Sequence, residues 1–167
     1  MASSPFKLPI PYRVFFLFVE PISTFVGAFY AHFLPQTYLL LTDAASSPSS
    51  LSDLPLATRI TLTQLANLYL LFGINEALVL RSTSDLRVWR TFLIGLLIAD
   101  LGHLYSVSAL GPDVYWKFWT WTSMHWGNVA FVYVGAMMRI AFLCGVGMPP
   151  TRQSTSGKHG NASVKAA

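Results

Sequence analysis

Long apolar runs separated by short polar segments dominate this chain. A membrane-spanning helix needs about 20 mainly apolar residues, because the helix rises 1.5 Å per residue and the hydrocarbon layer is about 30 Å thick. The pattern predicts spans over about residues 14–34, 62–80, 88–110 and 121–146. We therefore expect an all-α, polytopic membrane protein folded as a four-transmembrane-helix bundle.

The polar segments fit as connections between these spans. Residues 1–12 contain three prolines and predict an extended lead-in. Residues 35–60 form the longest predicted loop, in which the apolar run Tyr38–Leu41 either extends the first helix or lies at the membrane interface. The turn over residues 81–87 is short, so helices two and three should pack as an antiparallel pair.

Composition supports the membrane assignment. Hydrophobic residues make up 53% of the 167 residues, and charged residues only 11%, whereas a soluble domain has about 25% charged residues to cover its surface. This excludes a soluble enzyme, a disordered regulator and a disulfide-stapled secreted domain. The net charge of +4 comes from short basic clusters between apolar runs, so it does not indicate nucleic-acid binding. The single cysteine, Cys144, cannot form an internal disulfide.

The distribution of basic residues predicts the orientation in the membrane. With four spans, one side carries Lys7, Arg13, Arg81, Arg87, Arg90, Arg152, Lys158 and Lys165. The other side carries only Arg59 and Lys117. Because cytoplasmic loops are enriched in Lys and Arg, both termini should be cytoplasmic. We expect residues 1–147 to form the membrane domain, residues 148–167 to form a disordered cytosolic tail, and the endoplasmic reticulum to be the host membrane.

Ionisable residues inside predicted spans are costly and indicate function or a structural pairing. Glu20, Glu76 and Arg139 each lie within a turn or two of the cytosolic end of their predicted spans. They should therefore share one layer of the bundle. We predict an ion cluster there, which either locks helices one, two and four together or gives Glu76 a catalytic role.

A second polar group lies deeper. Asp100 falls near the centre of the third span with no basic residue in sequence reach, and His103 follows at i+3 on the same helix face. The two residues supply only two metal ligands, so we expect a hydrogen-bonded pair, with no metal and no cofactor. Asp100, His103 and Glu76 are the candidate catalytic residues.

Polar stripes on two other helices suggest where this pair faces. In the fourth predicted span, helical spacing places one set on a single face: His125, Asn128, Val132, Gly135 and Arg139. In the second predicted span, it places another set on a single face: Gln64, Asn67, Leu71 and Asn75. Lipid cannot satisfy such groups, so we expect the stripes to meet around a cavity rimmed by Trp126, Tyr105, Tyr69 and Phe131. The candidate substrate-binding residues are Trp126, Asn128, Tyr105, Asn67 and His125.

Several segments carry a family resemblance. They are LPIPYRVFFLFVEPISTFVGAFYAHF, QLANLYLLFGINEALVLR, LLIADLGHLYS and WGNVAFVYVGAMMRIAF. Together they resemble an uncharacterised fungal family of small four-helix integral membrane proteins, over about residues 8–147. More loosely, the chain is similar to the emopamil-binding (EXPERA) fold, which includes a sterol isomerase and the sigma-2 receptor. That resemblance implies a membrane cavity for a sterol or amine, and an acid that protonates a double bond.

Two functional interpretations remain open. In the first, the protein is an isomerase or cyclase that protonates a sterol or terpenoid and stabilises the carbocation with aromatic rings. In the second, it is a non-catalytic lipid- or sterol-binding protein or an accessory scaffold. Both predict a membrane lipid, sterol or terpenoid as ligand and no nucleic acid as partner. The sequence leaves open whether the bundle acts alone or as a homo-oligomer.

Overall fold

The computed structural model describes residues 8–149, which form helices and loops without a strand in that range. The α-helices are α1 (Ile10–Val14), α2 (Glu20–Phe33), α3 (Pro35–Thr42), α4 (Leu56–Ser82), α5 (Leu86–Ser106), α6 (Ser123–His125) and α7 (Val132–Leu143). Two π-helical segments, η1 (Phe15–Val19) and η6 (Trp126–Phe131), join α1 to α2 and α6 to α7. Short 3-10 segments are η2 (Leu51–Asp53), η3 (Val107–Leu110), η4 (Pro112–Tyr115) and η5 (Phe118–Thr120). The all-α prediction is confirmed.

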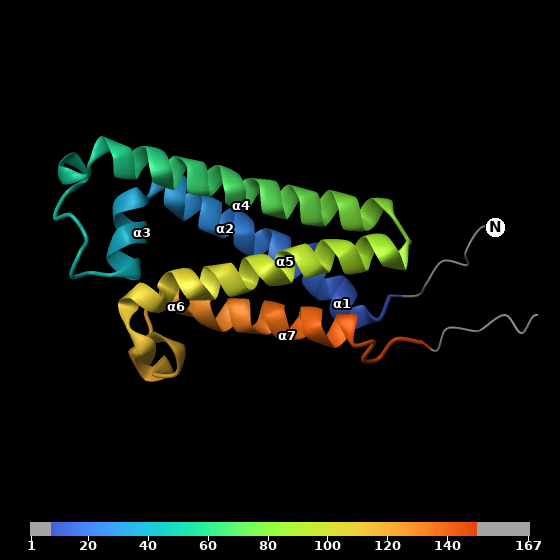
Figure 1. Cartoon of the computed structure of the whole chain (residues 1–167). Coiled ribbons are helices and arrows are strands. Elements are labelled where there is room, and N and C mark those ends of the chain that lie inside the picture. The colour runs from blue at the N-terminus through green and yellow to red at the C-terminus, as the bar shows by residue number, and fades with distance from the viewer. Residues whose placement is uncertain (1–7, 150–167) are drawn as a thin grey trace, which may run out of the picture.

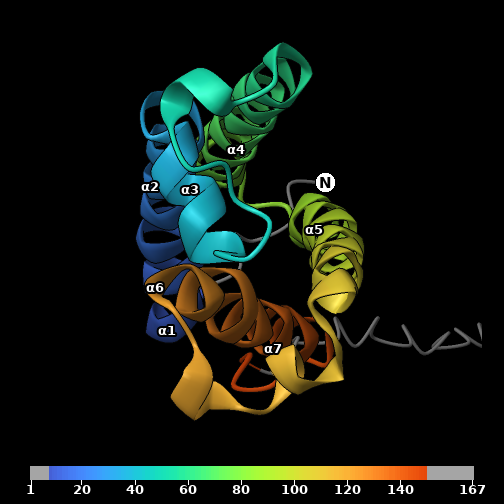
Figure 2. The same cartoon turned by 90° about the vertical axis from the view of Figure 1, so that its left-hand side faces the viewer.

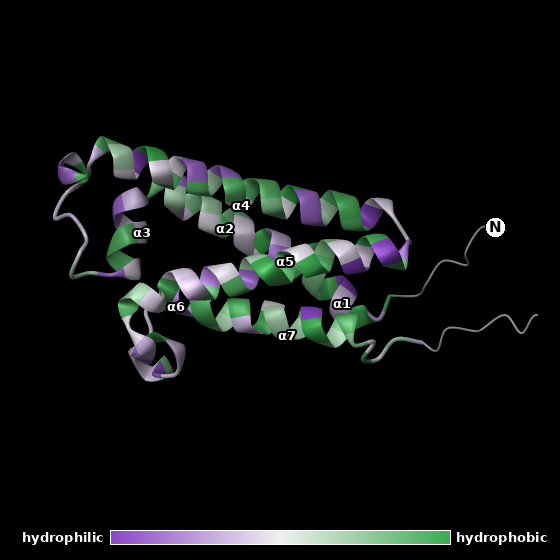
Figure 3. Ribbon diagram, in the orientation of Figure 1, coloured by the Kyte–Doolittle hydropathy of each residue, from purple (hydrophilic) through white to green (hydrophobic). Residues whose placement is uncertain are grey.

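Three continuous helices are long and apolar enough to cross a membrane: Ile10–Phe33, Leu86–Leu110 and Ser123–Leu143. They match three of the four predicted spans to within a few residues and indicate a membrane protein. The helix α4 is longer than any of them but less apolar, because it carries several amides and an acid between its leucines (Figure 3).

The long helices pack in two pairs, α2 with α4 and α5 with α7 (Figure 1). In the end view of Figure 2, α4 and α5 lie apart although only the turn 83–85 separates them in the chain. The expectation that these two helices pack as an antiparallel pair is therefore wrong. They run in opposite directions, but α4 packs its buried face against α2 and α5 packs its buried face against α7.

The connections gather at the two ends of the bundle. The start of α1, the turn 83–85 and the end of α7 lie at one end, and α3 lies at the other (Figure 1). The predicted tail lies mostly outside the described residues, as do Lys7, Arg152, Lys158 and Lys165. The run Tyr38–Leu41 belongs to α3, a separate helix that begins at Pro35 after a break at Leu34. It neither continues α2 nor forms part of an irregular loop.

Prolines shape the first span. Pro9 precedes the first helical residue and Pro11 lies in the first turn of α1, where a missing N–H costs nothing. The helix therefore begins at Ile10, before the predicted residue 14. Pro21 deprives the Leu17 carbonyl of its helical donor, and Arg81 Nη2 from α4 supplies the missing hydrogen bond at 2.5 Å. A backbone hydrogen bond that is lost in the first span is thus replaced by a side chain of α4.

A glycine allows α2 and α4 to approach closely. A Cβ added at Gly73 would lie 2.4 Å from Thr24 Oγ1 and 3.3 Å from the Pro21 carbonyl oxygen. The main core lies toward the end of the bundle that holds the start of α1 and the end of α7. Aromatic rings of several helices form it, and Phe16 and Phe142 are fully buried there. This packed end leaves the other half of the bundle to hold the candidate site.

Candidate functional site

The four long helical stretches each contribute one ionisable side chain to a single cluster. Arg139 of α7 pairs through Nη2 with Glu20 Oε1 at the start of α2, and through Nη1 with Asp100 Oδ2 of α5 at 2.7 Å. The Glu76 carboxyl of α4 lies close to the Glu20 carboxyl. The Arg139 side chain is 1% exposed. The structure thus brings Glu20, Glu76 and Arg139 together and adds Asp100.

Asp100 has a cationic partner, Arg139, although no basic residue lies near it in the sequence. Helical side chains lean toward the N-terminus of their own helix. Because α5 and α7 run antiparallel, the side chains of Asp100 and Arg139 lean toward each other. The long Arg139 side chain therefore connects Asp100 to the ion cluster, although the sequence predicts that Asp100 lies deeper in the bundle. This lean carries the Arg139 guanidinium over Gly135, where an added Cβ would lie 2.7 Å from Arg139 Nη1.

The cluster holds three carboxyl groups and one guanidinium. If all were ionised, its net charge would be −2 in a buried setting, which is strongly unfavourable. Glu20 Oε2 and Glu76 Oε1 are buried without a hydrogen-bond donor among the described residues. A proton on one of these two carboxyls removes a charge and supplies the hydrogen bond between them. A proton shared by Glu20 and Glu76 would therefore lower the free-energy cost of burying the cluster.

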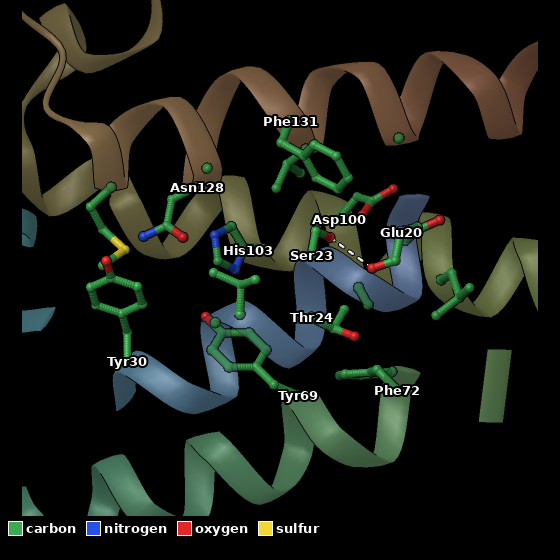
Figure 4. A pocket seen from close by; sticks show the side chains of 18 of the residues that line it. Glu20, Ser23, Thr24, Tyr30, Tyr69, Phe72, Asp100, His103, Asn128 and Phe131 are labelled. Carbon is green, nitrogen blue, oxygen red and sulfur yellow. Dashed lines mark hydrogen bonds between the residues drawn. The ribbon is translucent and has the colours of Figure 1, made fainter. Parts of the chain in front are cut away.

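A cavity of about 520 Å³ lies against this cluster. Its walls come from α2, α3, α4, α5 and the stretch from α6 to α7, and Figure 4 shows aromatic and polar side chains converging on it. The ion cluster, with Glu20, Glu76, Asp100 and Arg139, forms one end. The rings of Tyr30, Tyr38, Tyr69, Phe72 and Phe131 line the remainder.

Both π-helical segments adjoin this cavity. The segment η1 ends directly before Glu20, and η6 contains Asn128 and Phe131. A π turn inserts one extra residue and rotates the next part of the helix, and such turns occur often at functional sites. Here they bring Glu20 and Asn128 onto the inner face. Neither turn is predicted by the order of residues, in which Pro21 is the one visible signal of irregular geometry.

His103 lines the cavity, but it does not pair with Asp100. Asp100 is bonded to Arg139, and His103 Nε2 is buried without a hydrogen-bond partner in residues 8–149. Asn128 lies beside the imidazole (Figure 4). The predicted Asp100–His103 hydrogen bond is therefore wrong. His103 instead offers a free polar atom to whatever fills the cavity.

Several predicted substrate-binding residues lie away from the cavity. Trp126 and Tyr105 are 51% and 79% exposed, and neither contributes to the lining. Asn67 is exposed on the outer side of α4. Of the residues proposed to bind substrate, Asn128 lines the cavity. Tyr69 and Phe131, expected at the rim, line it as well.

The polar stripe of the second predicted span lies on the outer surface of the bundle, and the prediction that it faces the cavity is wrong. The buried face of α4 consists of Leu62, Ala66, Gly73, Glu76 and Leu80. Gln64, Asn67 and Leu71 lie on the opposite, exposed face. Polarity misled the prediction because the inner face of α4 packs tightly on α2 and needs small and apolar residues.

His125 belongs to a separate feature. Its ring lies 3.3 Å from the Thr122 backbone N–H and 3.1 Å from the Thr42 carbonyl oxygen, so it caps α6 and ties it to α3. It lines a second cavity of about 250 Å³ with Asp43. The Ser46 hydroxyl donates to Asp43, and this hydrogen bond holds the pKa of that loop carboxyl below its ordinary value. His125 therefore has a structural role in this fold.

Three further cavity residues, Ser23, Thr24 and Tyr38, were not predicted from the sequence. Ser23 and Thr24 follow Pro21, and their hydroxyls donate to the Glu20 and Pro21 carbonyls at 2.7 and 2.8 Å. Tyr38 comes from α3, and its hydroxyl lies 3.1 Å from that of Tyr69. Among the residues that the structure describes, no three His, Cys, Asp or Glu side chains are arranged to hold a metal ion.

Comparison with known proteins identifies the family. The family model described as "Domain of unknown function (DUF7704)" matches residues 6–149. This is most of the chain, so the protein belongs to that family. No curated protein and no solved structure matches the chain.

Proposed function

We propose that this protein is an integral membrane protein that binds a largely apolar small molecule, of the sterol or terpenoid class, in the cavity between its helices. The observation that carries the proposal is the cavity of about 520 Å³, lined by aromatic rings and bounded at one end by the ion cluster. Ligand pockets of about 300–1,000 Å³ combine apolar walls with a few polar groups in this way. The EXPERA resemblance points to the same class of ligand.

The proposal includes α4 as a fourth span. Its 27 residues reach about 40 Å at the helical rise, which exceeds the hydrocarbon thickness of about 30 Å. It packs along α2, which is apolar enough to cross a membrane. Its outer surface also exposes large apolar side chains, including Leu68, Leu71 and Leu78.

The proposed orientation puts both termini in the cytosol. Arg13, Arg81, Arg87 and Arg90 belong to the bundle end that holds the start of α1 and the turn 83–85. Arg59 and Lys117 belong to the opposite end. This bias supports a cytosolic location for the first end. The endoplasmic reticulum remains the proposed host membrane, to be checked by fluorescence microscopy of the tagged chain.

The ligand enters, in this proposal, from the lipid phase between α4 and α5. Both helices contribute residues to the cavity wall, and they diverge from each other (Figure 2). A ligand already dissolved in the bilayer would then enter the cavity laterally, without passing through water. Its polar group would meet the cluster or the free Nε2 of His103, and its apolar body would lie against the rings of Tyr69, Phe72 and Phe131.

Binding is tested with a photoreactive sterol and a photoreactive fatty-acyl probe on the protein in lipid nanodiscs. Ala99→Phe fills the cavity from its α5 wall, and Ile98→Phe places the same phenyl ring on the outer face of the same helix. We expect the sterol probe to label the parent and Ile98→Phe, and to lose most labelling in Ala99→Phe. Equal labelling of all three proteins, or preference for the acyl probe, contradicts the proposal.

A second candidate function is an acid-catalysed isomerisation of the bound ligand, favoured by the buried, unpartnered carboxyl oxygens of Glu20 and Glu76 at the cavity. Glu76 would give its proton to one carbon of a C=C bond, leaving a carbocation that aromatic faces stabilise. His103 would remove a proton from the neighbouring carbon, so the double bond forms one position away. The imidazolium then returns a proton to the Glu76 carboxylate, and no oxidant or reductant is needed. In this scheme Asp100, the third candidate catalytic residue, is paired with Arg139 and positions the cluster.

Deuterium transfer tests this second candidate. The protein is incubated in D₂O with a sterol that has an isomerisable double bond, and the product is analysed by mass spectrometry. We expect deuterium in the shifted alkene, and at least about a 100-fold slower reaction in Glu76→Gln with sterol labelling retained. Asp113→Asn, in an exposed loop salt bridge, serves as the control. Exchange at the parental rate in Glu76→Gln would exclude the catalytic role and leave the binding proposal standing.

A further inference from the structure

The outer face of α4 has a regular composition. Six residues follow one another at alternating spacings of four and three: Ile60, Gln64, Asn67, Leu71, Ile74 and Leu78. All six are exposed in the structure. They lie opposite the face that α4 buries against α2. We call these six residues the outer seam.

The spacing of the outer seam is that of a two-helix interface. An alternation of four and three averages 3.5 residues per turn, which places one continuous stripe against a partner helix with a slight left-handed supercoil. Apolar residues occupy four of its positions and amides two. The adjoining positions Leu68 and Leu70 are 51% and 39% exposed and apolar, so they suit contact with lipid.

The two amides give a physical reason for a partner. Neither the Gln64 nor the Asn67 side chain makes a hydrogen bond within residues 8–149. An amide left in hydrocarbon without a partner is unfavourable, and polar side chains join helices within membranes by hydrogen bonds. If α4 crosses the membrane, these amides require a donor and acceptor from another chain.

We propose that two copies of this protein associate in the membrane through the outer seam of α4. Copies with the same orientation in the bilayer carry α4 in the same direction, so their seams meet in parallel and in register around a two-fold axis. Each amide both donates and accepts, so Gln64 and Asn67 satisfy the same residues of the second copy. The seam has no charged residue, which suits identical faces because like charges would repel.

This inference rests on the membrane-spanning α4 of the proposed function, but it does not depend on the ligand. The cavity lies on the buried side of α4, where Tyr69, Phe72 and Glu76 reach inward. The seam lies on the other side of the helix. Dimerisation therefore leaves the cavity walls intact and brings two cavities to opposite sides of a shared α4 pair.

Cysteine cross-linking in native membranes tests the pairing. The native cysteine is removed by Cys144→Ser, and single cysteines are introduced as Leu71→Cys or Ile74→Cys in the seam. Leu70→Cys and Ile98→Cys, both at exposed apolar positions, serve as controls. We expect the seam variants to form disulfide dimers under mild oxidation at least about ten times faster than the controls. Equal rates in all four variants, or a cross-link to a different protein, overturn the proposal.

The amides are tested separately. In nanodiscs, energy transfer between two differently labelled copies reports association, and we expect the double variant Gln64→Ala, Asn67→Ala to associate about tenfold more weakly. Thr61→Ala, on an exposed but different face of α4, should associate like the parent. Unchanged association in the double variant would overturn the role of the amides in the pairing.

The membrane position of α4 has its own control. Rapid labelling of Leu71→Cys by a membrane-impermeant maleimide in intact membranes would show that α4 does not span, and would overturn the fourth span and the dimer together. Slow labelling with no cross-link would overturn the dimer alone. Sterol labelling that persists in such a monomer would leave the proposed binding function in place.

Discussion

The guanidinium of Arg139 in α7 donates a hydrogen bond to Asp100 in α5 at 2.7 Å, although 39 residues separate them in the chain. The same guanidinium pairs with Glu20 at the start of α2. One side chain thereby ties the two helix pairs of the bundle together. Because the guanidinium is almost fully buried, its removal would leave uncompensated carboxylates inside the bundle.

Replacement of Arg139 should be strongly destabilising. Arg139→Leu leaves Glu20 and Asp100 buried without a cation, and breaking a buried ion pair in this way costs about 3–5 kcal/mol. Thermal unfolding in detergent measures the loss, with the exposed Arg90→Leu as a control that should unfold near the parental temperature. Adding Glu20→Gln and Asp100→Asn to Arg139→Leu should recover part of the stability. A single variant as stable as the parent would contradict the cluster.

Gly135 should tolerate no side chain. Its Cβ would lie 2.7 Å from Arg139 Nη1, and the guanidinium cannot move away without breaking its bond to Asp100. We expect Gly135→Ala to lower the stability by about 1–3 kcal/mol. Gly102→Ala, where nothing lies within 4 Å, should raise it by up to about 1 kcal/mol, because alanine favours helix. The same sign of change in both variants would argue against the described packing.

The contact of Gly73 with α2 predicts a rescue. Gly73→Ala should destabilise the bundle by about 1–3 kcal/mol, because its Cβ would lie 2.4 Å from Thr24 Oγ1. Thr24→Ala removes that oxygen, so the double variant should be more stable than Gly73→Ala alone. Denaturation curves of the four proteins give the coupling between the two sites. Strictly additive effects would mean that the helices do not approach here.

The bond from Arg81 to the Leu17 carbonyl predicts a dependence on Pro21. Arg81→Gln should cost about 1–3 kcal/mol, since it leaves a buried acceptor without a partner. Pro21→Ala restores a backbone N–H that can reach the Leu17 carbonyl, so the Arg81→Gln substitution should cost less in that background. A double-mutant cycle measured by thermal unfolding checks the difference. An equal cost in both backgrounds would contradict the assigned role of Arg81.

Three of the four predicted spans and the clustering of buried charges were accessible from the sequence because both depend on local rules. An apolar run of sufficient length must be helical in a bilayer, and charged residues such as Glu20 and Arg139 within it must find each other. The start of the first span was misjudged, since prolines in a first helical turn do not prevent helix formation. The π turns were missed because they leave almost no signature in the order of residues.

The direction in which each polar face points could not be read from its polarity. Gln64 and Asn67 form a regular stripe, yet α4 buries the opposite face, since close packing on α2 requires the small Gly73 and the shape around it. Trp126 and Tyr105 also look like pocket residues in sequence but lie on the outside. Polarity reports that a group needs a partner, and it does not report which neighbour provides one.

The order of residues alone establishes that the chain is a helical membrane protein, where its apolar helices lie, and that acids and a single arginine must meet inside it. Only the packed bundle reveals that Asp100 pairs with Arg139 and not with His103, that α4 and α5 diverge, and that a cavity lies between the helix pairs. The reason is physical. Helix formation and membrane insertion depend on neighbouring residues, whereas ion pairing and cavity shape depend on the lean, rotation and spacing of helices distant in the chain.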